Sequence, residues 1–173
     1  AVLILADSGG LQKSEFEKFK AWIKRGGILV RFSGPRLASH PDKLLPVKLR
    51  AGDRVMGGAM SWSKPATLKV FGPKSPFFGL DIPNDVAVHR QVLAQPSLAL
   101  DGKTWARLSD GTPLVTAQRQ GQGWLVLIHT TANTAWSNLP LSGLFVNMLR
   151  RIIALSQGTV ARKDGPPLAP LKV

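Results

Sequence analysis

The sequence predicts an α/β fold, in which a parallel sheet is flanked by helices and carries an inserted β-rich subdomain. Residues 1–6 (AVLILA), 28–32 (ILVRF) and 124–129 (WLVLIH) are apolar runs typical of strands that are covered on both faces. A helical pattern follows the first run and another follows the last. Between about residues 44 and 122, short β-rich stretches are separated by Gly, Pro and Asp, which indicates the insertion.

Residues 1–32 have the pattern of a strand, a helix and a second strand. Ser14 and Glu17 have the spacing of a capping box, apolar side chains then recur at helical spacing, and Gly26 and Gly27 follow as a stop signal. The segment is therefore expected to form a βαβ unit, whose crossover is right-handed in nearly all known proteins.

Five strands are expected in the inserted region, at residues 46–50, 66–71, 86–93, 105–108 and 114–119. The glycine-rich run at residues 52–58 is interpreted as a bend, because it lacks the Lys-Ser/Thr ending of a phosphate-binding loop. A last helix is expected to begin near Pro140 and to end at Gly158. Residues 1–158 would then form one domain, and the Pro-rich residues 159–173 a linker or tail.

Charge and composition exclude several classes of protein. The 173 residues are 44% hydrophobic and carry a net charge of +13, which is not the composition of a disordered or fibrous chain. The basic residues are scattered, without the aromatic interleaving of a nucleic-acid groove. No apolar stretch is long enough to span a membrane. Because the chain opens directly in an apolar run without Met, we expect it to be a fragment of a longer protein.

Three loops should meet at the carboxyl edge of the parallel sheet, where α/β proteins bind ligands. They offer a carboxylate, hydroxyls, an amide, an imidazole and a guanidinium, which together could hold a small polar or anionic molecule. The alternative is that these residues only form turns and helix caps, which need the same residue types. The candidate ligand-binding residues are Asp7, Ser8, Gly9, Ser33, Gly34, Arg36, His129, Thr130 and Asn133.

No catalytic group or metal site is predicted from the pattern. His129 ends an apolar strand, where an imidazole could act as a general base but is more often a structural residue. Ser8 and Ser33 lack the Gly-x-Ser-x-Gly elbow of a nucleophile. The histidines are far apart in sequence, and the chain has no Cys, so we expect neither a metal ion nor another cofactor.

Three segments resemble a known family. Residues 14–35, with the course FxxFxxWIKRGGILVRFSGP, and residues 108–129, LSDGTPLVTAQRQGQGWLVLIH, resemble class I glutamine amidotransferase-like domains. Residues 136–151, WSNLPLSGLFVNMLRR, look like a segment of large bacterial membrane proteins. These proteins join a BatA-type N-terminal anchor and transmembrane helices to an amidotransferase-like domain and a C-terminal domain of unknown function. The resemblance implies a flavodoxin-like or amidotransferase-like sheet.

The resemblance also implies a soluble domain of a membrane-anchored cell-envelope protein, on a side of the membrane that it does not specify. Active amidotransferases attack the substrate with a Cys, and this chain has none, so glutaminase activity is not expected. The favoured function is a non-catalytic scaffold or interaction domain that contacts a protein partner or neighbouring domains. The alternatives are a sensor or unrecognised hydrolase that uses the strand-end loops, and a binder of nucleic acid or anionic lipid through the basic surface.

Overall fold

The computed structural model describes residues 1–50 and 59–157. The glycine-rich run at residues 52–58, the expected helix stop at Gly158 and the Pro-rich tail at 159–173 lie outside the described residues.

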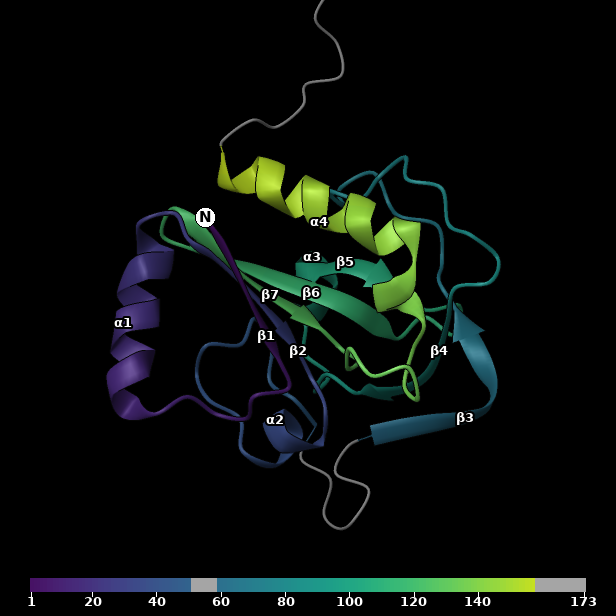
Figure 1. Cartoon of the computed structure of the whole chain (residues 1–173), viewed down its shortest axis with the longest axis horizontal. Coiled ribbons are helices and arrows are strands. Elements are labelled where there is room, and N and C mark those ends of the chain that lie inside the picture. The colour runs from purple at the N-terminus through teal and green to yellow at the C-terminus, as the bar shows by residue number, and fades with distance from the viewer. Residues whose placement is uncertain (51–58, 158–173) are drawn as a thin grey trace, which may run out of the picture.

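The main sheet has five strands in the order β1-β2-β7-β6-β5. The three apolar runs form β1 (Val2–Ala6), β2 (Ile28–Phe32) and β7 (Gly123–Ile128), and these pair in parallel as expected. β6 (Pro113–Gln120) and β5 (Thr104–Arg107) extend the sheet in the antiparallel direction. The molecule is therefore an α/β protein with a mixed sheet (Figure 1).

The expected sheet is parallel in three of its strands, but the whole sheet is mixed, and the connection between β6 and β7 explains why. Only Gly121 and Gln122 separate these strands, and such a short connection can join only antiparallel neighbours. Gly121 has a φ of 65°, which glycine adopts without strain. Residues 104–120, part of the predicted inserted segment, thus belong to the main sheet.

The remaining strands form a small second sheet. β3 (Ala59–Thr67) pairs in the antiparallel direction with β4 (Ala87–Val92). β4 lies within the strand expected at 86–93, whereas β3 overlaps the strand expected at 66–71 only at residues 66 and 67. The strand expected at residues 46–50 is reduced to one bridge between Leu49 and Ala94.

Helices lie on both faces of the main sheet (Figure 1). α1 (Lys13–Lys24) covers the face that contains Leu29 and Leu125, and α4 (Gly143–Ser156) covers the face that contains Val30 and Val126. α1 approaches the sheet closely at Gly123, because a Cβ there would lie 2.2 Å from the carbonyl oxygen of Ile23 and closer still to that of Gly27. Glycine at the start of β7 therefore sets the distance between α1 and the sheet.

Both predicted helices begin a little away from their expected starts. The Glu15 carboxylate accepts a hydrogen bond from the amide of Gln12 over 3.2 Å, so α1 starts at Lys13 and not after Ser14. Pro140 belongs to a short 3-10 helix, η1 (Leu139–Leu141), and α4 begins after Ser142, whose hydroxyl accepts from the amide of Phe145.

Two short helices were not predicted. They are α2 (Pro35–Ser39) and α3 (Leu100–Lys103), each less than two turns long. None of the helices within residues 1–50 and 59–157 combines the length and apolarity needed to cross a bilayer.

Candidate functional site

The carboxyl ends of β1, β2 and β7 bring several of the predicted site residues together. Asp7 follows β1 with a φ of 41°, a left-handed conformation that Asp tolerates better than most residues. Its Oδ1 accepts hydrogen bonds from the amides of Gly34 and Leu37, both at 3.0 Å. Asp7 therefore caps the first turn of α2 from a distant strand, and its carboxylate is used by the fold.

Ser33 and Gly34, the first two residues after β2, are packed tightly against the neighbouring strand ends. Ser33 is fully buried, and its hydroxyl donates to the carbonyl of Ile128 over 3.2 Å. At Gly34 a Cβ would lie 2.5 Å from Oδ2 of Asp7 and 2.5 Å from Cγ2 of Thr131. Glycine is therefore required at position 34, because a side chain there would collide with Asp7 and Thr131.

His129 is enclosed and has both ring nitrogens hydrogen-bonded. Its Nδ1 lies 2.8 Å from the carbonyl oxygen of Val92, which can only accept, so Nδ1 carries the proton. Its Nε2 then accepts from the hydroxyl of Thr116 at 2.9 Å. Burial lowers the pKa of His129 from 6.5 to about 4, against the opposing effect of the Val92 hydrogen bond. The imidazole is thus neutral, in one tautomer and shielded from substrate.

The loop after β7 fastens the second sheet to the first. The carbonyl of His129 accepts from the amide of Val92 at 2.8 Å, and the hydroxyl of Thr130 donates to the carbonyl of Arg90 at 2.9 Å. Arg90 in turn lies over the ring of Trp136, 5.1 Å from its centroid. Asn133 is exposed, and its side chain accepts from the amide of Ala135 within the same loop. His129 and Thr130 therefore join β7 to β4.

Gly9 and Arg36, two of the predicted residues, line an open cavity. It has a volume of about 500 Å³ and lies beside α2, where Gly10, Pro35, Ser39 and His40 complete its walls. Ser8 is exposed but does not line it. Of the predicted ligand-binding residues, Asp7, Ser33, His129 and Thr130 make hydrogen bonds within the fold. Ser8, Arg36 and Asn133 are exposed.

A buried ion pair beneath this edge was missed by the sequence analysis. Arg31 lies in the apolar strand β2 and is 1% exposed. Its Nη1 donates hydrogen bonds to both carboxylate oxygens of Asp42, each at 2.8 Å. Its Nη2 donates to the carbonyl of Gly9 at 2.6 Å. Asp42 also accepts from the amides of Leu11 and Leu44, so the pair joins β2 to the loops on either side. The only signal was one Arg within an apolar strand.

The arrangement offers little chemistry at the strand ends. A general base or a nucleophile must reach its substrate, whereas His129 and Ser33 are both 0% exposed. In the part of the chain that the structure describes, no three or more His, Asp or Glu side chains gather in a way that could hold a metal ion.

Comparisons with known proteins show the fold and no family. No protein-family profile matches the sequence, and no curated protein is significantly similar to it. Two cytoplasmic proteins from Salmonella typhimurium have similar structures. One is 17% identical, with a TM-score of 0.61, and the match covers 86% of this chain and 70% of the other. The second is 11% identical, with a TM-score of 0.62, and the match covers 92% and 71%.

A β-galactosidase from Rahnella sp. R3 is also similar, at 13% identity and a TM-score of 0.58. The match covers 89% of this chain but only 23% of the enzyme. At these identities the similarity concerns the fold alone. The amidotransferase resemblance stays a prediction, since none of these three structures is described as an amidotransferase.

Proposed function

We propose that this chain is a non-catalytic scaffold or interaction domain of a membrane-anchored bacterial cell-envelope protein. One observation carries the non-catalytic part: the side chains best suited to chemistry at the strand ends are used internally. Asp7 caps α2, Ser33 bonds to β7, and His129 bonds to β4 through Nδ1 and to β6 through Nε2. An active site needs such groups to be free to meet a substrate.

The anchoring part rests on the resemblance of residues 136–151 to a segment of large bacterial membrane proteins. The fold also occurs as one part of a longer chain, since the match to the Rahnella enzyme covers less than a quarter of that protein, and this supports only the domain-of-a-longer-protein element of the proposal. A domain of this kind would contribute surfaces for its neighbours instead of a reaction.

The surface best suited to such a contact lies along β1 and the adjacent α4. β1 is an edge strand that pairs only with β2 among the described strands. Ala1 and Asp7 bond to β2, and parallel strands alternate, so the amides of Val2, Ile4 and Ala6 point away from the sheet. β1 has neither a charge nor a Pro, the features that usually protect an edge.

Exposed apolar side chains lie on β1 and on α4. Ile4 is 43% exposed, and Val146 and Ile153 on the outer side of α4 are 48% and 44% exposed. Ile4 points to the same face of the sheet as Val2, which packs into the core under α4. The free edge and these side chains form what we call the β1–α4 surface, and we propose that another domain of the parent chain covers it.

Hydrogen exchange tests the interaction part. The amides of Val2 and Ile4 should exchange more slowly in the membrane-anchored parent protein than in residues 1–173 alone, because a covering domain would protect them. The amide of Leu5, which bonds to β2, is the internal control and should be protected in both. Equal exchange of Val2 and Ile4 in the two proteins would contradict the proposal.

A glutaminase assay tests the non-catalytic part. Ammonia release from L-glutamine by residues 1–173 should not exceed that of buffer, and His129→Gln should give the same result. Turnover by the natural chain that His129→Gln abolishes would refute this part, and would leave the exchange experiment unaffected.

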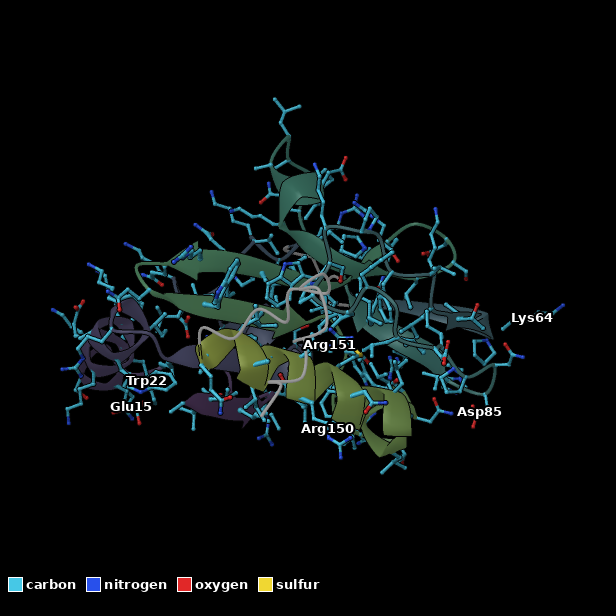
Figure 2. All side chains as sticks on the ribbon, turned by 90° about the horizontal axis from the view of Figure 1, so that it is seen from above. Glu15, Trp22, Lys64, Asp85, Arg150 and Arg151 are labelled. Carbon is cyan, nitrogen blue, oxygen red and sulfur yellow. The ribbon has the colours of Figure 1, made fainter. Side chains whose placement is uncertain are left out.

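The two alternative functions have weaker support. A sensor at the strand ends would depend on the shallow cavity at Arg36, because the other polar groups there bond internally. A nucleic-acid or lipid binder would need its charge on one face. Figure 2 shows instead that Lys64 lies at one end of the molecule and Arg150 on α4, far from each other.

A further inference from the structure

A second cavity lies away from the strand ends, on the face of the sheet opposite α4. Its volume is about 680 Å³, within the range of sites that bind small molecules. The chain around residues 41–49 forms one wall, residues 95–97 form another, and Lys103 and Gln118 close the third. Gln118 pairs with Leu125 and shares its face of the sheet, which α1 covers farther along but leaves open here.

The walls of this cavity are held in place by hydrogen bonds. The amide of Gln95 donates to the carbonyl of Lys48 at 2.8 Å, and the amide of Arg50 donates to that of Leu93 at 2.8 Å. Lys103 Nζ reaches across to the carbonyl of Pro46 at 2.9 Å and to Oε1 of Gln118 at 3.0 Å. A cavity with fixed walls loses little conformational entropy when a ligand enters.

The charge of the cavity is positive. Lys43, Lys48 and Lys103 line it, and none of them has a carboxylate within 4.0 Å among the described residues. The one acidic residue of the lining, Asp42, is neutralised from below by the guanidinium of Arg31. Asp101, close to Lys103 in the sequence, is paired with Arg107. Three lysines therefore line the cavity, and none of them is paired with a carboxylate among the described residues.

The rest of the lining is largely apolar. Leu45, Val47 and Leu49 contribute aliphatic side chains, and three prolines add ring surface. We infer that this cavity, which we call the lysine cavity, binds a small organic anion with an apolar body. The acidic head would meet the ammonium groups, with Lys103 already positioned by its two acceptors, and the body would displace water from the aliphatic wall. This site is separate from the β1–α4 surface and from the strand-end residues.

Calorimetric titration of residues 1–173 tests the inference with three probes. 2-Naphthoate carries both the charge and the apolar body, 2-naphthamide has the body without the charge, and acetate has the charge without the body. 2-Naphthoate should bind with one site per chain, at least about tenfold more tightly than either other probe. Relative to 2-naphthamide it gains a hydrogen bond to a charged group, and relative to acetate it buries an apolar ring system, and each is worth at least about that much.

Variants locate the binding. Lys103→Met and Lys48→Met should each weaken 2-naphthoate binding, the first by about tenfold. Lys24→Met is the matched control, because Lys24 ends α1 and does not line the cavity. Lys48→Met also guards against a loss of folding in Lys103→Met, since the Lys48 side chain is exposed and makes none of the hydrogen bonds that fix the walls.

Three results would overturn the inference. They are equal affinity for 2-naphthoate and 2-naphthamide, binding that survives in both cavity variants, and no binding of any probe. None of these bears on glutamine turnover or on exchange at β1, so failure here is distinct from failure of the proposed function.

Discussion

At the scale of single residues, the side chains at the strand ends act on stability. Asp7→Ala removes the acceptor for the amides of Gly34 and Leu37. The free energy of unfolding should fall by about 1–2 kcal/mol, the usual effect of losing a helix cap. Urea denaturation measures the change. Ser8→Ala is the control and should stay within about 0.5 kcal/mol, because Ser8 is exposed. Similar losses in both variants would contradict the capping role.

His129 predicts how stability depends on pH. Its pKa is about 4 in the folded protein and 6.5 when exposed, so between these values the unfolded chain binds a proton that the folded chain does not. The free energy of unfolding should therefore fall as the pH is lowered from 6.5 to 4, by about 3 kcal/mol in total from this residue. Above pH 6.5 His129 should add no slope.

A comparison with His129→Gln isolates this effect from that of the carboxylates. Gln gains no charge, so the stability difference between the natural chain and the variant should shrink as the pH falls from about 7 to about 4. Urea denaturation across this range is the measurement. Parallel pH profiles would show that His129 is accessible to protons in the folded state.

At the scale of elements, the pair of Arg31 and Asp42 joins β2 to the loop at residues 41–49. Asp42→Ala leaves a guanidinium buried without its anion, and should lower the free energy of unfolding by about 3–5 kcal/mol. Asp101→Ala breaks the exposed pair with Arg107 and should lower it by less than about 1 kcal/mol. Thermal or urea denaturation compares the two.

A double variant distinguishes the buried charge from the other hydrogen bonds of Asp42. Adding Arg31→Met to Asp42→Ala removes the stranded charge and should restore part of the lost stability. If the stability losses of Asp42→Ala and Arg31→Met simply add in the double variant, the two residues do not interact energetically.

The same elements show what a sequence can and cannot predict. β1, β2 and β7 were predicted because a strand buried on both faces must be apolar along its length. β6 was predicted as a strand but not as part of the main sheet. The alternation of apolar and polar residues along one strand does not show which other strand it pairs with. The strand-end residues converge as expected, but their bonds to amides and carbonyls depend on packing that local patterns do not encode.

The ion pair and the lysine cavity were missed for a related reason. Arg31 and Asp42 are eleven positions apart and meet only because the chain turns back after α2. Lys48 and Lys103 come together because residues 41–49 fold over the face of the sheet near α3. Nothing in the spacing of these residues marks them as neighbours.

At the scale of the whole molecule, the net charge of +13 should oppose folding by self-repulsion. Raising the salt concentration from low to physiological should increase the free energy of unfolding by about 1 kcal/mol, because it screens these charges. A triple variant with Lys18→Gln, Lys64→Gln and Lys74→Gln, all exposed, should respond less. Urea denaturation at several salt concentrations provides the measurement. Stability that falls with salt would point to favourable ion pairs instead.

The register of β2 against β7, which sets Ile28 beside Trp124, has a consequence for synthesis. At about 5–20 residues per second, β7 leaves the ribosome roughly 5–20 s after β2. Throughout that interval the edge of β2 that later pairs with β7 has no partner strand, and its apolar side chains remain accessible to other chains. The yield of this protein should therefore depend on translation speed and on the supply of chaperones.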